Sequence, residues 1–238
     1  MIEVADLTVR FGGVVPIDQM TVTFAAGTCG LIGPNGAGKT TFFNVLSGFV
    51  RPFAGSVQAF GEDLLAMPDF KRSRWGVRRT FQTEQAIANL TVAENVLLVH
   101  EHSGGERASR RDDVDRAVAF VGLEAVADRL VGGLGAAQRR LVEIARAVVG
   151  SPRLVLLDEP AAGLPEDETA HLAGLIRRIP DETGALAILV DHDMSLVSAC
   201  CATTAVLDFG RLIADGPTAS VLRDPQVVRA YLGTEEVA

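Results

Sequence analysis

The chain of 238 residues has few cysteines and almost no lysine. Its three cysteines are Cys29 and the adjacent pair Cys200 and Cys201, and their spacing matches neither a disulfide framework nor a zinc site. We therefore expect reduced thiols in the protein core. Lysine occurs only at positions 39 and 71, so arginine supplies all the other basic residues.

The sequence also lacks an excess of basic charge. It has 30 acidic and 22 basic residues, which gives a formal net charge of −8. This balance argues against binding to the phosphate backbone of nucleic acid. Any phosphate that the protein holds must therefore be held by a local site.

No membrane span or secretory signal is recognisable. The uncharged run at 194–207 is too short and too polar to cross a bilayer, which requires about 20 apolar residues. The opening MIEVADLTVRF alternates apolar and polar side chains and includes Glu3 and Asp6, unlike a cleavable signal. We expect a cytoplasmic protein, either free or seated against a membrane protein.

The hydrophobic pattern predicts strands at both ends of the chain. Alternation at 2–11 and 19–24 predicts an antiparallel hairpin, and TCGLIG at 28–33 is typical of a buried strand that enters a glycine-rich turn. The apolar runs at 153–160 and 185–193 are separated by a helical stretch. This alternation of apolar runs with a helical stretch predicts a parallel sheet with crossover helices.

A mainly helical region is predicted between about Leu90 and Val149. Thr91 is a candidate N-cap, and Glu94 completes the pattern of a capping box. The charged segment 106–116 is typical of a solvated helix surface. We also expect His100 and His102 to lie at a solvated helix end rather than to bind a metal.

Residues 33–40 match the pattern G-x-x-x-x-G-K-[ST] between a predicted strand and a predicted helix. In such a loop the backbone N–H groups surround phosphate oxygens, and the positive end of the following helix points at them. Thr40 can offer its hydroxyl to Mg²⁺. The phosphate-binding residues predicted here are Gly33, Asn35, Gly36, Ala37, Gly38, Lys39 and Thr40.

The rarity of lysine gives a second argument for this loop. Where an ammonium and a guanidinium are interchangeable, this chain uses arginine, yet position 39 is lysine. A compact point charge on a flexible stem suits a narrow phosphate cradle.

Polar residues that follow other predicted strands complete a candidate site. Asp158 and Glu159 end a buried strand, at the sheet edge where open α/β proteins bind ligands. Asp158 fits as a holder of Mg²⁺, and Glu159 as the base or water-orienting group for attack on a γ-phosphate. His192 ends another such strand and fits as a γ-phosphate contact. Gln82 could reach the metal or the water.

With these residues in this order, nearly the whole chain resembles the nucleotide-binding subunit of an ABC transporter. More specifically, it resembles the ATP-binding subunits of branched-chain amino acid importers. The segments that carry this resemblance are RFGG at 10–13, LIGPNGAGKTTFFNVLSGF at 31–49, GVRRTFQ at 76–82, DEPAAGL at 158–164 and VVRAYLG at 227–233.

The resemblance implies an α/β fold of the P-loop NTPase class. It would be one ABC-type nucleotide-binding domain over residues 1–238, with a RecA-like core, an antiparallel β subdomain and a helical subdomain. We place the core at approximately 1–82 and 151–238 and the helical lobe at approximately 83–150. The resemblance further implies that Phe11 stacks on adenine and that Thr41 supports the phosphates. From the residues alone, an aromatic at a strand end is more often a core residue.

The segment from Leu134 to Gln138 departs from the family pattern. It resembles the L-S-G-G-Q element, whose helix N-terminus contacts the ATP bound by the opposite subunit. Here the residues that would make this contact in trans are Gly135, Ala136, Ala137 and Gln138. The serine hydroxyl is missing, and losing one hydrogen bond to a charged group costs about 1.5–3 kcal/mol. Tolerance of small residues in this branch of the family is the alternative interpretation.

A second departure is Pro165, where the family has aspartate or asparagine. Proline removes a side-chain hydrogen bond and a backbone donor together. Both departures favour a heterodimer, in which a partner subunit with an intact element would complete the ATP site of this chain.

The resemblance implies an ATPase that uses ATP and Mg²⁺ to drive import of a small solute, such as a branched-chain amino acid. Its partners would be a second ABC ATPase subunit, integral membrane permease subunits and, indirectly, a solute-binding protein. It would lie in the cytoplasm on the inner face of the membrane. The alternatives are the ATPase of a lipid or lipopolysaccharide exporter, a soluble ABC ATPase acting on DNA or ribosomes, and a nucleotide-binding regulator without turnover. The absence of coiled-coil insertions, tandem cassettes and a basic surface argues against the soluble ATPase, and Glu159 against the regulator.

Overall fold

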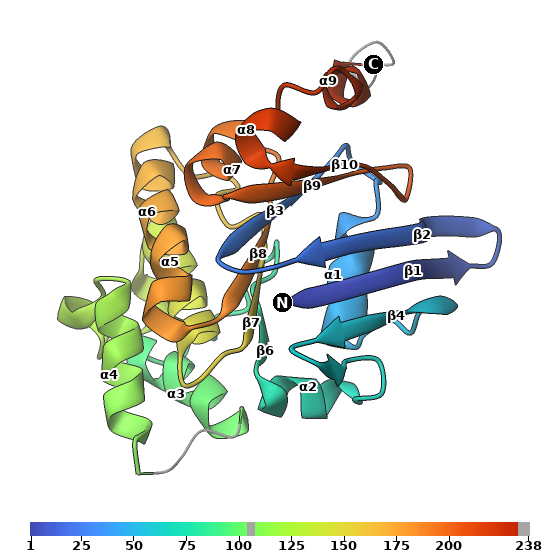
Figure 1. Cartoon of the computed structure of the whole chain (residues 1–238). Helices are drawn as coiled ribbons and strands as arrows, with labels where there is room; N and C mark the ends of the chain where they lie inside the picture. The colour runs from blue at the N-terminus through green and yellow to red at the C-terminus, as the bar shows by residue number, and fades with distance from the viewer. Residues whose placement is uncertain (104–107, 233–238) are drawn as a thin grey trace.

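The computed structural model describes residues 1–103 and 108–232, which fold around two β-sheets (Figure 1). Within these residues one sheet has four strands in the order β2-β1-β4-β5, and the other has six in the order β10-β9-β3-β8-β7-β6. The first sheet lies on one side of the second, and helices cover the opposite side (Figure 1).

The four-stranded sheet is antiparallel. It consists of β1 (Ile2–Phe11), β2 (Val14–Phe24), β4 (Ala54–Ala59) and β5 (Glu62–Asp63). The predicted opening hairpin is confirmed, but β2 begins at Val14 rather than at position 19. The pairing of β1 with β2 shifts register between Val4 and Phe11. These irregularities, together with Pro16, hide the strand alternation in the sequence.

The six-stranded sheet is parallel except at one edge. It contains β6 (Val77–Arg79), β7 (Leu154–Asp158), β8 (Leu186–Val190), β3 (Thr28–Ile32) and β9 (Thr203–Asp208), which pair in parallel, and β10 (Arg211–Pro217), which pairs antiparallel with β9. The predicted parallel sheet is thus confirmed. All residues of β3, β7 and β8 are buried. The carboxyl ends of these strands meet at one edge, which positions the segments that follow them.

Helix α1 (Lys39–Ser47) packs between the two sheets, where Phe42 and Phe43 are fully buried. On the other face of the six-stranded sheet lie α5 (Ala136–Val148), α6 (Glu166–Thr183) and α7 (Met194–Cys200). Successive side chains of β7 point to opposite faces of the sheet. Leu154 and Leu156 belong to the hydrophobic cluster around α1, and Val155 and Leu157 to the cluster on the side of α5, α6 and α7. Outside the segment between β6 and β7, the other helices are α2 (Asp69–Trp75), α8 (Thr218–Val221) and α9 (Pro225–Leu232).

A hydrogen bond links β3 to α6 at a proline. Pro180 lies inside α6 and has no N–H to donate to the carbonyl of Ile176, one turn earlier. The hydroxyl of the buried Thr28 donates to this carbonyl instead, at 3.4 Å. The backbone donor that proline removes is therefore replaced by a side chain of the sheet.

Between β6 and β7 the described chain is mainly helical, as predicted. It forms α3 (Val92–His102), α4 (Arg110–Phe120) and α5, with the single-turn 3₁₀ helices η1 (Glu124–Val126) and η2 (Val131–Gly133). The predicted capping box of α3 is confirmed, because Thr91 Oγ1 accepts from Glu94 N at 3.1 Å and Glu94 Oε2 accepts from Thr91 N at 2.8 Å. The division into a core and a lobe over 83–150 stays a prediction.

The expectation for His100 was wrong. Its side chain is 1% exposed, and its Nε2 lies 2.9 Å from Asp113 Oδ2 on α4. Helix α4 packs against α3 and carries this carboxylate over the imidazole, which shields both groups from water. The predictions for His102, Arg111 and Asp112 are confirmed, since all three are exposed. Residues 106 and 107 of the charged segment lie outside the described residues.

Two further expectations from composition hold for the part of the chain that the structure describes. All three cysteines are free and buried, and burial raises the pKa of each thiol, that of Cys200 to about 12. In the described ranges, every helix is too short or too polar to cross a membrane.

Candidate nucleotide-binding site

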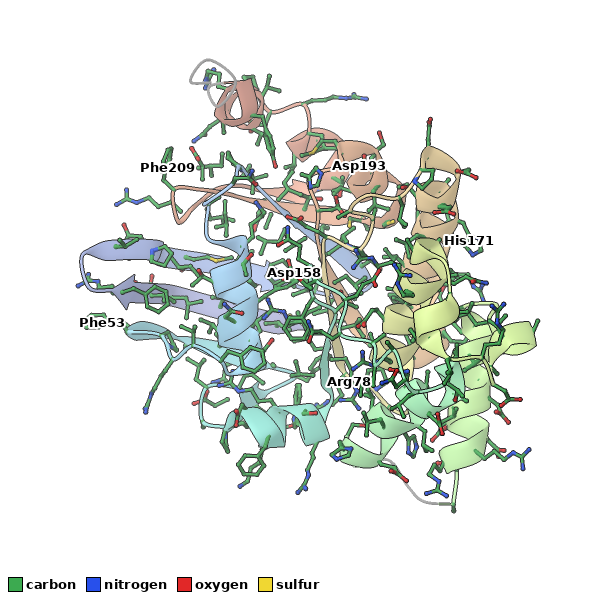
Figure 2. The ribbon with its side chains drawn as sticks, turned by 180° about the vertical axis from the view of Figure 1, so that it is seen from behind. Phe53, Arg78, Asp158, His171, Asp193 and Phe209 are labelled. Carbon is green, nitrogen blue, oxygen red and sulfur yellow. The ribbon has the colours of Figure 1, made fainter. Side chains whose placement is uncertain are left out.

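A cavity of about 260 Å³ opens at the sheet edge where β3 and β7 end. Asp158, the last residue of β7, lies between α1 on one side and α5 and α6 on the other (Figure 2). The cavity gathers most of the residues predicted to form the site, although they are far apart in sequence. It is lined by Pro16, Asn35, Gly36, Ala37, Gly38, Lys39, Thr40, Thr41, Gln82 and Glu159.

Two positions of the loop at 33–40 have room only for glycine. Gly33 has φ 149°, and a Cβ there would lie 2.0 Å from the carbonyl oxygen of Leu207 in β9. Gly38 has φ 108°, and a Cβ there would lie 2.2 Å from the carbonyl oxygen of Pro16 in β2. Both sheets therefore fix the loop by close backbone contact, which only glycine permits.

Lys39 is enclosed by this loop and is only 8% exposed. Its Nζ donates to the carbonyl oxygens of Gly33 at 2.6 Å and Pro34 at 2.9 Å. Burial lowers the pKa of the ammonium, and the nearby carboxylates of Glu159 and Asp158 oppose this shift. The side chain is thus held in one position inside the loop, beside the acidic pair.

Glu159 and Gln82 contact each other directly. Gln82 Nε2 donates to Glu159 Oε2 at 2.9 Å. The backbone of Glu159 has φ 47°, a left-handed conformation that is strained for a residue with a side chain, and its N–H donates to Val190 O of β8 at 2.8 Å. Strained non-glycine residues of this kind concentrate at functional sites.

Asp158 is buried and forms an ion pair with Arg79. Arg79 was not among the site residues predicted from the sequence. Arg79 Nη2 lies 2.9 Å from Asp158 Oδ2, and its Nη1 donates to Asn44 Oδ1 at 2.7 Å. The guanidinium also lies over the ring of Phe81, 4.8 Å from its centroid. The position of Arg79 three residues before Gln82 was the only signal in the sequence.

His192 and Phe11 do not line the cavity. His192 follows β8 at the expected sheet edge, but its side chain is 67% exposed, and its Nδ1 is 3.8 Å from the carboxylate of Asp191. Asp191 is buried, which raises its pKa. Phe11 ends β1 with 52% of its surface exposed, which excludes the alternative of a core residue and leaves stacking on adenine a prediction.

The C-terminal helix reaches the phosphate loop through Tyr231. Burial raises the pKa of Tyr231 to about 12, and the nearby backbone of Gly33 opposes this shift. Gly33 thus lies between Tyr231 of α9 and the ammonium of Lys39, which donates to the Gly33 carbonyl oxygen. In the sequence, Tyr231 stood out only as part of the VVRAYLG segment, and no contact with the phosphate loop was predicted for it.

The segment 135–138 lies away from this cavity, at the start of α5. Gly135 is the N-cap and Ala136 the first helical residue, and both are exposed. No side chain caps the helix, and only the Oε1 of Gln138 turns back to accept from Gly135 N, at 3.4 Å. Pro165 occupies the N-cap position of α6, again without a side-chain cap.

The residues at the cavity fit Mg²⁺ better than a metal held by protein alone. Among the described residues, no three His, Cys, Asp or Glu side chains gather in a way that could hold a metal ion. Thr40 and Gln82 line the cavity, whereas Asp158 lies behind Glu159 with its Oδ2 paired to Arg79. All three offer oxygen atoms, the donors that Mg²⁺ prefers when phosphates and water complete its shell.

Comparison with known proteins agrees with this arrangement. A family model described as ABC transporter matches residues 17–162, and one described as branched-chain amino acid ATP-binding cassette transporter matches residues 211–237. The high-affinity branched-chain amino acid transport ATP-binding proteins BraF of Pseudomonas aeruginosa and LivG of Escherichia coli are each 36% identical to the chain, with 98% of both sequences covered.

Solved structures give the same result. The ADP conformation of MJ1267, an ATP-binding cassette of an ABC transporter, superposes with a TM-score of 0.87 at 26% identity, covering 98% of both chains. A nucleotide-free ATP-binding cassette from an ABC transporter superposes with a TM-score of 0.84, also at 26% identity, covering 97% of this chain and 98% of the other.

Proposed function

The chain belongs to the ABC transporter family of ATP-hydrolysing subunits, and we propose on that premise that it drives the import of branched-chain or related amino acids. The observation that carries the solute class is similarity along the full chain to BraF and LivG, including the separate match at 211–237. The cavity at the ends of β3 and β7 supports the ATPase activity itself.

We propose that the loop at 33–40 binds the phosphates of ATP. Its backbone N–H groups and the N-terminus of α1 supply hydrogen bonds and positive potential, and Lys39 adds a point charge. Thr41 supports the phosphates from the first turn of α1. Phe11 stacks on the adenine, for which its exposed ring is available.

Hydrolysis is assigned to the residues around the acidic pair. Glu159 orients the attacking water or accepts its proton, with Gln82 hydrogen-bonded to it. His192 contacts the γ-phosphate once the exposed side chain turns toward it. Thr40, Asp158 and Gln82 would hold Mg²⁺, which when bound neutralises charge on the phosphates.

An importer ATPase of this family acts with membrane permease subunits. We propose that this chain lies on the inner face of the membrane and closes head to tail on a second ABC ATPase subunit. The start of α5 would then contact the ATP of that partner through Gly135, Ala136, Ala137 and Gln138. Because this element lacks the serine hydroxyl, a heterodimer with one strong site accounts for the sequence better than a homodimer with two weak ones.

Transport by the assembled complex tests the solute. The chain would be purified with its permease from native membranes and reconstituted in vesicles with the cognate solute-binding protein. ATP-driven uptake of leucine, isoleucine or valine is expected, with methionine as the matched control because the methionine import ATPase MetN 1 of Rhodococcus jostii is also 34% identical. Uptake of methionine alone, or extraction of lipid, would overturn the proposed solute class.

ATP turnover tests the heterodimer. A mixture of the chain with its partner ATPase should hydrolyse ATP about tenfold or more faster than the chain alone, which follows from the hydrogen bond that Gly135 cannot make. Equal rates would overturn the asymmetric assembly while leaving the ATPase assignment intact.

A further inference from the structure

A cavity of about 200 Å³ lies between α5 and α6, and it shares no lining residue with the cavity at the ends of β3 and β7. Figure 2 shows His171, one of its lining residues, among the helices on one side of the six-stranded sheet. Pockets for drug-sized ligands measure about 300–1,000 Å³, so this smaller cavity suits a molecule the size of an amino acid. Its apolar lining consists of Ala137, Leu141, Leu164 and Leu172.

The cation of this cavity is Arg140, whose hydrogen bonds are incomplete. The residue is 6% exposed, and its Nε is buried without a hydrogen-bond partner. Within residues 1–103 and 108–232, Arg140 has no ion pair and a single hydrogen bond, from its Nη1 to Phe81 O. At 3.5 Å this bond is long.

The other arginines of α5 have carboxylate partners. Arg139 Nε lies 2.8 Å from Glu84 Oε2, and Arg146 Nη1 lies 3.0 Å from Glu143 Oε1. Glu143 is one turn from Arg140, but its Oε1 is also occupied by a backbone N–H. A buried guanidinium without a counter-ion is costly, and it is stabilised when a carboxylate reaches it. Arg140 therefore indicates an anionic group in the cavity.

Two acidic side chains of α6, Asp167 and Glu168, line the same cavity. Asp167 is exposed and Glu168 half-buried, and His171 stands one turn further along the helix. In the described ranges no ion pair joins either carboxylate to Arg140. Acidic residues at a helix start are favourable on their own and would not indicate a ligand. Across a cavity from an unpaired guanidinium, they provide the opposite charge.

A cation on one helix, carboxylates on the other and leucines between them match the groups of a free apolar α-amino acid. We propose that this cavity binds such an amino acid. Its carboxylate pairs with the guanidinium of Arg140, and its ammonium with Asp167 and Glu168. Its hydrocarbon side chain packs against the leucines that line the cavity.

Arg140 connects this cavity to the candidate ATP site. Its Nη1 bonds to the carbonyl of Phe81, the residue before Gln82, and Gln82 Nε2 donates to Glu159 Oε2. A ligand carboxylate on the guanidinium competes with the long bond to Phe81 and loosens the segment that positions Gln82. Occupation therefore lowers ATP turnover. The site lies beyond the proposed function, but its use as a sensor of accumulated solute rests on it, since the solute proposed there is of the same class.

Binding to the full chain tests the site, with L-leucine as the probe. Isothermal titration should show saturable binding of leucine. Leucinamide, which lacks the carboxylate, and 4-methylpentanoate, which lacks the ammonium, should each bind at least about tenfold more weakly. Equal affinity for the three compounds, or no saturable binding of leucine, would overturn the proposal.

Substitutions assign the two charged contacts. In Arg140→Gln, leucine and leucinamide should bind alike, because the group that distinguishes them is gone. In the double variant Asp167→Asn and Glu168→Gln, leucine and 4-methylpentanoate should bind alike. Glu166→Gln, at the start of the same helix but outside the cavity lining, should keep both preferences of the wild type. Preferences that persist in the Arg140 and Asp167/Glu168 variants would place the ligand elsewhere and overturn the site.

ATP turnover of the complex purified with its permease tests the sensor. Saturating leucine should lower turnover by about fivefold or more in the wild type and leave that of Arg140→Gln unchanged. An effect of leucine that acts through the permease would persist in Arg140→Gln and would overturn the sensor. The proposed function is decided separately by uptake, because a chain that drives uptake of methionine alone could still bind leucine in this cavity.

Discussion

The phosphate loop and the start of α5 are both helix N-termini for which the sequence predicts a phosphate, yet they are built in opposite ways. The loop is enclosed: Lys39 is held by two carbonyls and Gly33 is in contact with β9 and Tyr231. At the start of α5, Gly135 is exposed and a Cβ added there would meet nothing within 4 Å. The chain therefore organises its proposed ATP site internally, whereas the second terminus would depend on what a partner subunit brings to it.

The largest effect is expected at the enclosed site from Glu159→Gln. Removing the base or water-orienting carboxylate should lower ATP turnover by about 10²–10⁴-fold while ATP still binds. Phosphate release and nucleotide binding would be measured together, with Glu166→Gln, exposed at the start of α6, as the control. Unchanged turnover would remove Glu159 from the mechanism.

The next effect is expected from Lys39→Arg, which keeps the charge. A planar guanidinium does not fit a loop that leaves the side chain 8% exposed and bonded to two carbonyls. Losing two charge-assisted bonds to phosphate, at about 1.5–3 kcal/mol each, should weaken ATP binding by about a hundredfold or more. Titration calorimetry would measure it, and Lys71→Arg on the exposed side of α2 should bind as the wild type does. Equal affinities would show that the cradle needs only a positive charge.

At the open terminus a gain is expected instead of a loss. Gly135→Ser adds the missing hydroxyl in a backbone conformation, φ −66° and ψ 162°, that serine adopts freely. Turnover at the partner's ATP site should rise about tenfold, the effect of one hydrogen bond to a charged group. Gly133→Ser, where a Cβ is equally unobstructed, is the matched control. If both variants behave alike, the serine is not what this terminus lacks.

The smallest effect concerns stability. Pro165→Asp would give α6 the side-chain cap that it lacks and should raise the free energy of unfolding by about 1 kcal/mol. Denaturant unfolding would measure the change, and Pro165→Ala should not reproduce it. A gain in both variants would indicate that removing proline, rather than adding a cap, is responsible.

The sequence predicted those parts of the fold and candidate site that depend on local pattern. The phosphate loop, the strands at 154–158 and 186–190 and the cap of α3 are each encoded within a few consecutive residues. Because parallel strands end at one edge, the proximity of the loop to Glu159 also followed from the pattern.

Contacts between distant segments could not be predicted in this way. No periodicity reveals that Asp113 covers His100, or that Arg79 pairs with Asp158, because each contact depends on how two elements pack. The same holds for the contact of Tyr231 with Gly33. The early start of β2 was missed for a local reason, since Pro16 and the register shifts interrupt its alternation.

The link between Thr28 and Pro180 implies epistasis between two positions far apart in the chain. Thr28→Val alone would leave the carbonyl of Ile176 without a hydrogen-bond donor and lower the free energy of unfolding by about 1–3 kcal/mol. In a Pro180→Ala background the restored N–H would donate to Ile176 O, so the same change at position 28 would be nearly neutral. Related lineages should therefore lose the hydroxyl at position 28 only after losing the proline at position 180.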